Sequence, residues 1–180
     1  MNKNKLIYGA SVFDFDETIA FSDNIISATK NGYTISITSY DWPKVGEKMI
    51  SDGWVMDFDD FNKITNGVPG PLIQKLKNQL HKYSYDSIYI LTARHSDSEE
   101  AIYNWLLSQN IELKRENIVG LGNSTGKAKA DWIQDNLISS GVNDIYFVDD
   151  AFSNIQAVEE MFKEYPKGFL IEGGKSIITK

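Results

Sequence analysis

The chain of 180 residues contains no cysteine, only two histidines and no long uninterrupted run of hydrophobic residues. The lack of cysteine excludes disulfide bonds, thiolate metal sites and a cysteine nucleophile. No stretch approaches the roughly 18 apolar residues of a membrane-spanning helix. The apolar segment 6–13 is short and leads straight into Asp14 and Asp16. We therefore interpret this segment as a buried strand rather than a signal peptide, and we expect a cytoplasmic protein.

Basic residues are in the minority, because 18 lysines and arginines stand against 25 aspartates and glutamates, which gives a formal net charge of −7. This balance argues against an extensive nucleic-acid-binding surface and against binding to an anionic membrane, but it allows a local basic pocket. Hydrophobic residues make up 42% of the chain, an ordinary share for a globular protein. The length suits one domain over residues 1–180 with a small insertion.

Five short apolar runs, rich in β-branched and aromatic residues, predict strands that are covered on both faces. Helical patterns over 98–109, 127–139 and 153–165 separate the last four runs. This alternation is typical of a parallel sheet with helices on both faces, so we predict an α/β fold. The five predicted strands are Leu6–Phe13, Ser87–Leu91, Asn117–Leu121, Asp144–Val148 and Gly168–Ile171.

The segment between the first two predicted strands is too long for a single crossover, so we predict a small cap insertion over residues 21–70. Within it, Asn31-Gly32 lies between two β-forming runs. This dipeptide favours a type I′ turn, which predicts a hairpin over 25–38. Two helices are predicted to follow, over 43–50 and 72–82.

Polar side chains follow the first two predicted strands. Asp14 and Asp16 end the first strand, where two carboxylates are costly unless a metal ion or hydrogen bonds compensate them. Thr92 and Ala93 end the second strand, and a hydroxyl followed by a turn with free backbone N–H groups can bind a phosphoryl oxygen. Taken alone, Thr92 is explained equally well as a helix cap.

Charged side chains follow the third and fourth predicted strands. Lys127 and Lys129 lie at the start of a helix, where a basic residue can neutralise a phosphate that faces the positive end of the helix. Either lysine alone is also explained as a solvated charge, and the sequence does not choose between them. Asp149 and Asp150 are adjacent carboxylates, which suggests a hard divalent cation such as Mg²⁺, although Asp150 alone could cap the next helix.

The conjunction of these four clusters carries more weight than any one of them. The carboxyl ends of parallel strands open on one edge of a sheet, where ligands bind in α/β proteins. Together the clusters would supply a nucleophile, an acid/base, phosphate-binding groups and a metal site. The segment Asp57-Phe58-Asp59 repeats the core of the first cluster, but it lies in the insertion and we interpret it as an acidic, solvated loop.

The clusters resemble, in their order, the motifs of the haloacid dehalogenase (HAD) superfamily and in particular of its phosphatases, including small phage-borne members. The resemblance covers nearly the whole chain outside the insertion. It implies a Rossmann-like parallel sheet of five strands in the order 5-4-1-2-3, with a small hairpin-bearing cap after strand 1. The matching residues are Asp14-Phe15-Asp16-Glu17-Thr18, Thr92, Lys129 and Asp149-Asp150 with Asn154.

The resemblance further implies a Mg²⁺-dependent phosphomonoester hydrolase. Asp14 would be the nucleophile that forms an aspartyl-phosphate, and Asp16 would be the acid/base. Mg²⁺ would be held by Asp14, the backbone carbonyl of Asp16 and Asp149, with Asp150 nearby. The remaining roles implied are phosphate binding by Thr92, Ala93 and Lys129, and support by Thr18 and Asn154.

The substrate is left open between a nucleotide, a nucleic-acid terminal phosphate and another small phosphorylated compound. Arg94 is a candidate contact to a second phosphate or a nucleotide, with a surface salt bridge as the alternative. Lys127 is the second candidate substrate contact. A homodimer formed through the predicted hairpin also stays open.

A dinucleotide-binding module without phosphatase activity is the main rival interpretation. Gly120-x-Gly122-x-x-x-Gly126 follows a predicted strand and opens a helix, as in a loose Rossmann fingerprint. This interpretation leaves Asp14 and Asp16 without a role. A phosphorylated signalling receiver would have the acidic clusters in a different order along the chain, and a non-catalytic HAD scaffold would be expected to lack one of the key side chains.

Overall fold

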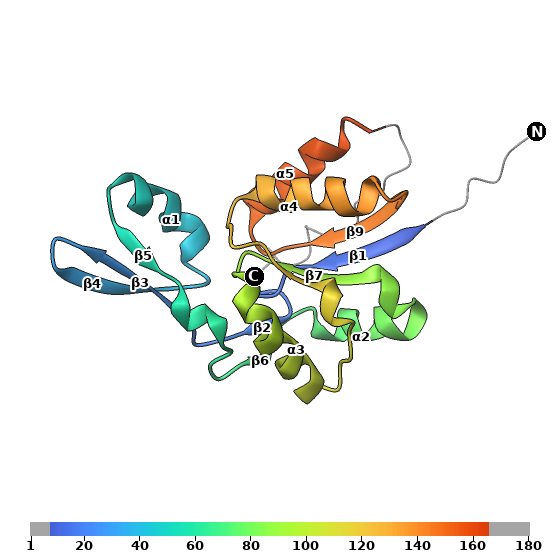
Figure 1. The fold of residues 1–180 in the computed structure, drawn as a ribbon, viewed down its shortest axis with the longest axis horizontal. Helices are drawn as coiled ribbons and strands as arrows, with labels where there is room; N and C mark the ends of the chain where they lie inside the picture. The colour runs from blue at the N-terminus through green and yellow to red at the C-terminus, as the bar shows by residue number, and fades with distance from the viewer. Residues whose placement is uncertain (1–7, 166–180) are drawn as a thin grey trace, which may run out of the picture.

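A parallel sheet of four strands in the order β8-β7-β1-β9 forms the centre of the computed structural model, which describes residues 8–165 (Figure 1). The α/β class is confirmed, and these four strands have the predicted relative order. The fifth predicted strand, 168–171, lies outside the described residues, so the order of five stays a prediction. The strands are β1 (Gly9–Phe13), β7 (Ile88–Thr92), β8 (Ile118–Gly120) and β9 (Asp144–Val148).

Helices cover both faces of this sheet, with α2 (Ile73–Lys82) and α3 (Glu99–Ser108) on one face and α4 (Gly126–Ile133) and α5 (Phe152–Phe162) on the other. The packing of strand β1 explains why its sequence is continuously apolar. Val12 packs into the cluster formed with α4 and α5, and the next residue, Phe13, packs into the cluster formed with α2 and α3. Successive side chains of a strand point to opposite faces, so a strand covered twice needs apolar residues throughout.

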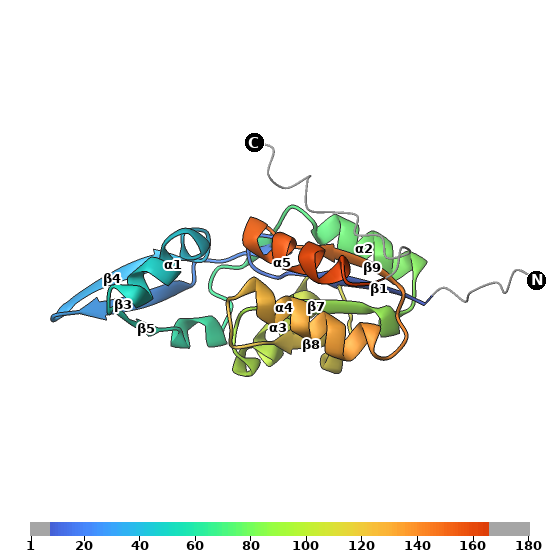
Figure 2. The ribbon, with the colours of Figure 1, turned by 90° about the horizontal axis from the view of Figure 1, so that it is seen from above.

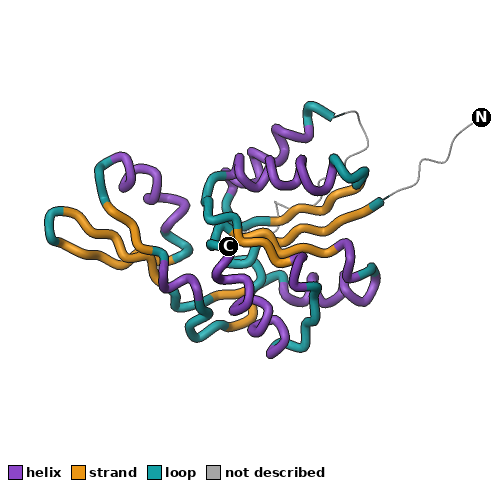
Figure 3. Tube along the Cα trace, viewed as in Figure 1, coloured by secondary structure: helices purple, strands orange, loops and turns teal. Residues whose placement is uncertain are grey.

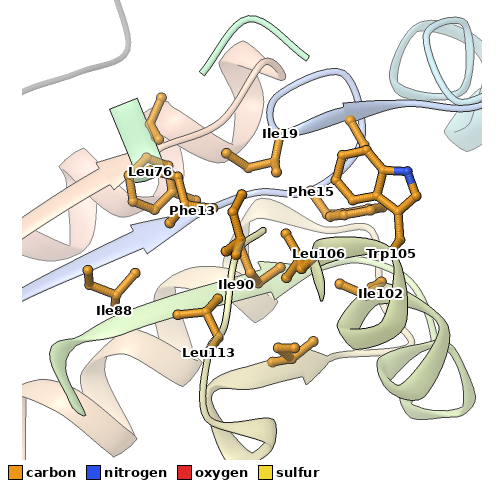
Figure 4. Packing of buried hydrophobic residues seen from close by; sticks show 14 residues of the cluster. Phe13, Phe15, Ile19, Leu76, Ile88, Ile90, Ile102, Trp105, Leu106 and Leu113 are labelled. Atoms are coloured by element: carbon orange, nitrogen blue, oxygen red, sulfur yellow. The ribbon is translucent and has the colours of Figure 1, made fainter. Parts of the chain in front are cut away.

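The core beneath α2 and α3 also fixes the loop that follows β1. Phe15, in this loop, is fully buried and lies edge-on to Trp105 of α3, with 5.5 Å between the ring centroids (Figure 4). Leu106 and Ile102 of the same helix pack beside them. Tilted aromatic pairs of this kind contribute beyond the area they bury, so the loop is attached firmly to the core on both sides of Asp14.

One predicted helix is α-helical only in its first part. The helix predicted over 127–139 is an α-helix only over Gly126–Ile133 and continues as a π-helical segment, Gln134–Ile138. The N–H of Ser139 donates to the carbonyl of Gln134 at 3.0 Å, five residues back. The short 3-10 segments are η1 (Asp59–Asn62), η2 (Tyr85–Ser87), η3 (Ser96–Ser98) and η4 (Arg115–Asn117).

The residues between β2 (Ala20–Phe21) and β6 (Val68–Pro69) form a small unit of their own, which contains the predicted hairpin. An antiparallel sheet in the order β4-β3-β5 packs one face on α1 (Trp42–Ser51), and Figures 2 and 3 show this unit extending away from the core sheet. Asn31 and Gly32 both have positive φ, 51° and 80°, which the type I′ turn requires. The strands are β3 (Ile25–Lys30), β4 (Tyr33–Thr38) and β5 (Val55–Asp57).

A short antiparallel ribbon joins the insertion to the core. It pairs β2 (Ala20–Phe21) with β6 (Val68–Pro69), so both connecting segments leave the core side by side. This ribbon lies close to the predicted limits of 21 and 70. Within residues 8–165, no helix combines the length and the apolar character needed to span a membrane.

Leu106 and its neighbour Leu107 offer a matched test of the core. Leu106 is fully buried, whereas Leu107 is 41% exposed on the same helix. Leu106→Ala should lower the free energy of unfolding by about 2–5 kcal/mol, because it leaves a cavity in the core. Leu107→Ala should change it by less than about 1 kcal/mol. Urea unfolding followed by circular dichroism measures both, and equal losses in the two variants would contradict this packing.

Candidate active site

A cavity of about 1100 Å³ lies between the carboxyl ends of the core strands and the insertion. The turns after β1, β7 and β9 and the start of α4 form its core side, and α1 and the segment around η1 form the opposite side. The predicted edge of the sheet therefore borders this cavity. Most of the predicted site residues line it, namely Asp14, Asp16, Thr92, Ala93, Arg94, Lys129, Asp149, Asp150 and Asn154.

Lys129 lies at the centre of this arrangement. Its side chain is 2% exposed, and its Nζ donates to Asp14 Oδ1 at 2.6 Å and to Asp149 Oδ2 at 2.5 Å. Burial alone would lower the pKa of Lys129, but the negative charges of Asp14 and Asp149 outweigh it and raise this pKa above its ordinary value. The lysine is therefore charged, and it joins two strand ends that are far apart in the sequence.

Lys127, which the sequence left as an alternative, lies on another face of α4. Its side chain is 80% exposed and its Nζ pairs with Asp131 at 2.5 Å, one turn further along the helix. It is not among the residues that line the cavity. Residues two positions apart on a helix do not share a face, so only one of the two lysines can point at the sheet edge.

Asp149 is held by three groups besides its strand. It accepts hydrogen bonds from Lys129, from the backbone N–H of Ala151 at 2.9 Å, and from Asn154 Nδ2 at 2.9 and 3.0 Å. Asn154 is buried in the first turn of α5. The orientation of the Asp149 carboxylate is therefore fixed by the protein itself.

Asp14, Asp149 and Asp150 form a cluster in which one carboxylate oxygen of each lies within 4.8 Å of the others. Burial raises the pKa of Asp14 well above its ordinary value, and neighbouring aspartates add to this while Lys129 opposes it. Burial and the charge of Asp149 raise the pKa of Asp150 to about 7. One ammonium group thus leaves negative charge uncompensated, and a set of hard oxygen donors with excess negative charge fits Mg²⁺.

Asp16 and Arg94 are paired in the protein interior, which corrects the surface salt bridge expected for Arg94. The Arg94 side chain is 2% exposed, so it does not form a surface salt bridge. Its Nε donates to Asp16 Oδ2 at 2.9 Å and its Nη2 donates to Asp16 Oδ1 at 2.7 Å. Its remaining N–H groups bond to residues at the base of the insertion, so they are turned toward the protein rather than toward a ligand.

Thr92 and Ala93 lie at the end of β7 and line the cavity as predicted. Thr92 Oγ1 accepts a hydrogen bond from the N–H of Arg94 at 3.2 Å, which leaves its own hydroxyl proton to donate to a ligand. Thr18 is different, because it is fully buried and is not among the cavity residues. Its carbonyl accepts from the N–H of Leu72 at 3.0 Å, so it supports the loop rather than the ligand.

Glu17 and Ser39 are cavity residues that sequence reasoning missed. Glu17 has φ 59°, an uncommon conformation for a residue other than glycine, and its Oε1 accepts from Ser39 Oγ at 2.6 Å. This bond links the loop after β1 to the insertion. The tight turn between β1 and the insertion was a signal for such a residue, but sequence alone does not show which position takes positive φ.

Two of the three glycines of the rival dinucleotide fingerprint are explained by packing. A Cβ on Gly120 would lie 2.5 Å from the carbonyl oxygen of His95, and one on Gly126 would lie 2.7 Å from that of Ser153. Both positions therefore require glycine because backbone segments approach closely, without a bound dinucleotide. The Gly126 contact also lets α4 approach α5, which places Lys129 over the sheet edge.

No family model, curated protein or solved structure matches this chain.

The raised pKa of Asp150 predicts how the stability of the metal-free protein changes with pH. Its folded pKa of about 7 exceeds the ordinary 3.8 of an unfolded chain, so between these values the folded state binds more protons than the unfolded state. The free energy of unfolding should therefore fall as pH rises, by about 1 kcal/mol between about pH 6 and about pH 8. Urea unfolding in EDTA measures this difference.

Asp150→Asn should reduce this pH dependence, whereas Asp135→Asn, at an exposed position on the π-helical segment, should leave it unchanged. Added Mg²⁺ should also reduce it, because the cation replaces the proton in neutralising the cluster. A stability that rises between the two pH values in EDTA would contradict the electrostatic description of this site.

Proposed function

We propose that this protein is a Mg²⁺-dependent phosphomonoester hydrolase of the HAD type that acts through an aspartyl-phosphate. The observation that carries the proposal is the contact of Lys129 Nζ with Asp14 at 2.6 Å and with Asp149 at 2.5 Å. It joins a potential nucleophile, a phosphate-neutralising cation and a metal ligand within one buried cluster. The order of the motifs along the chain supports the same assignment.

Asp14 would attack the phosphorus atom of the substrate. A bond forms between a carboxylate oxygen of Asp14 and phosphorus, and the bond from phosphorus to the ester oxygen breaks. A carboxylate and a phosphate dianion repel each other, so the attack needs positive charge beside both. Lys129 uses two of its three donors on Asp14 and Asp149, and its third would bind a phosphoryl oxygen together with the Thr92 hydroxyl.

Asp16 would transfer protons in both halves of the reaction. In the first half it gives a proton to the departing ester oxygen, and in the second it takes a proton from the water that attacks the aspartyl-phosphate. Hydrolysis then releases inorganic phosphate and regenerates the carboxylate of Asp14. Asp16 lines the cavity two residues beyond the nucleophile and stays 18% exposed despite its pairing with Arg94.

The cluster of three carboxylates would hold Mg²⁺ through Asp14 and Asp149, with Asp150 directly or through water. When bound, this ion neutralises phosphoryl charge and so lowers the repulsion that the attacking carboxylate meets. Asn154 and the N–H of Ala151 keep Asp149 in place for this purpose.

The cavity favours a small phosphorylated substrate, such as a nucleotide or the terminal phosphate of a nucleic acid. Its insertion side carries acidic residues, among them Glu47, Asp57 and Asp59. These charges disfavour a long polyanion over that side. The aromatic residues Trp42 and Trp54 pack in the core of the insertion, which gives them a structural role before any role in stacking a base.

Asp14→Asn should lower phosphate release by about 10⁴-fold or more, because the amide is not a nucleophile for phosphorus. Chelation with EDTA should abolish turnover and Mg²⁺ should restore it. The measurement is phosphate release from p-nitrophenyl phosphate and from a panel of phosphorylated metabolites and 3′- and 5′-phosphorylated oligonucleotides. Asp135→Asn should retain the wild-type rate; an Asp14→Asn variant that also retains it would disprove the mechanism.

The two lysines of α4 provide a matched pair. Lys129→Ala should lower kcat by about 10²–10³-fold, because it removes a charge that would contact the phosphoryl group. Lys127→Ala should have little effect, since this side chain pairs with Asp131 on the surface. Steady-state kinetics on folded variants, checked by circular dichroism, would contradict the assignment if Lys127→Ala were the more damaging change.

A further inference from the structure

Arg94 makes several contacts that have no role in the reaction proposed above. Its guanidinium is buried between two aromatic rings, with its central carbon 4.5 Å from the ring centroid of Phe61 and 5.4 Å from that of Phe15. Phe15 belongs to the core loop and Phe61 to the insertion. Cation–π contacts to two rings help to hold a guanidinium in place.

The N–H groups of Arg94 reach both segments that connect the core to the insertion. Nη1 donates to the carbonyls of Phe61 at 2.8 Å and Lys63 at 2.9 Å, on the returning segment. Nη2 lies 3.3 Å from Ser22 Oγ and 3.3 Å from Asn24 Oδ1, on the outgoing segment. Arg94 therefore bridges the two connecting segments at the base of the insertion.

The same guanidinium binds both oxygens of Asp16, through Nε at 2.9 Å and Nη2 at 2.7 Å. A parallel, two-point contact of this kind fixes the plane of a carboxylate as well as its position. It leaves lone pairs on each oxygen for a proton or a water molecule, because each carboxylate oxygen can accept more than one hydrogen bond.

We propose that Arg94 is the positioning residue for the acid/base carboxylate of Asp16 and that it sets this carboxylate in a fixed place relative to the insertion. The inference rests on the proposed phosphatase function. Arg94 touches neither the substrate nor the phosphorus atom; it acts through Asp16. Its alternative is a purely structural role, in which it only fastens the insertion to the core.

The two roles of Arg94 predict different dependences of kcat/KM on the leaving group of the substrate. Benzyl phosphate releases an alkoxide that needs a proton from Asp16, whereas p-nitrophenyl phosphate releases an anion that is stable without one. A misplaced Asp16 should therefore slow the first substrate more than the second. A loosened fold or a lost fraction of active enzyme should lower kcat/KM for both substrates by the same factor.

The experiment compares kcat/KM for the two substrates, with Mg²⁺ present, in the wild type, Arg94→Lys, Arg94→Met and Asp16→Asn. We expect both Arg94 variants to raise the preference for p-nitrophenyl phosphate by about tenfold or more, in the same direction as Asp16→Asn. In the double variant with Asp16→Asn, Arg94→Met should not change this preference further. Arg94→Lys keeps the positive charge, and its substrate preference decides the test if Arg94→Met does not fold.

Arg115→Met is the matched control, because Arg115 is the other arginine of the chain, lies over the ring of partly buried Tyr103 and pairs with Glu100 at the surface. It should leave both rates and their ratio unchanged. Equal losses on both substrates in folded Arg94 variants would overturn the positioning role while leaving the phosphatase function intact. A wild-type protein that releases phosphate from neither substrate, nor from the wider panel, would remove the function and this inference together.

Discussion

The ion pairs of one buried lysine determine how the candidate site is built. Lys129 neutralises two carboxylates from different strand ends, and all three side chains are almost completely buried. Buried charges are costly unless they are paired and hydrogen-bonded, so this contact fixes the position of α4 against the edge of the sheet. It also leaves a surplus of negative charge, because Asp150 adds a third carboxylate. The same electrostatic balance that holds the fold together therefore leaves a cluster that could hold a divalent cation and, in the proposed reaction, would face a phosphoryl group.

A second constraint acts on the loop that follows β1. Phe15 packs on Trp105 of the core, Glu17 bonds to Ser39 of the insertion, and Asp16 between them pairs with Arg94. Successive residues of this loop are thus tied to different parts of the molecule. The insertion is therefore a wall of the cavity whose position is coupled to Asp16, rather than an independent appendage. In the proposed reaction, this coupling would let the small insertion affect the position of the acid/base Asp16.

Much of this architecture could be predicted from the sequence because the relevant signals are local. Continuous apolar runs identify strands covered twice, and Asn31-Gly32 specifies the hairpin turn. The convergence of Asp14 and Asp149 follows from parallel strands opening on one edge. Arg94 could not be assigned, because its hydrogen-bond partners come from three separate segments and nothing in its own neighbourhood distinguishes a buried arginine from an exposed one. The choice between Lys129 and Lys127 depended on helix rotation, which requires the helix start at Gly126 to be known. No sequence pattern indicated the π-helical winding after Ile133, within which Leu137 packs into the core.

Detection of a covalent intermediate on Asp14 is the most direct test of the proposed mechanism. The protein would be mixed rapidly with substrate and Mg²⁺, quenched in acid and treated with borohydride, which reduces an acyl phosphate to an alcohol. Mass spectrometry of the peptides would then locate the reduced side chain. If Asp14 is the nucleophile, a homoserine should appear at position 14, and its formation should require both substrate and Mg²⁺. Phosphate release with no reduced residue at this position, or with the modification on another side chain, would contradict it.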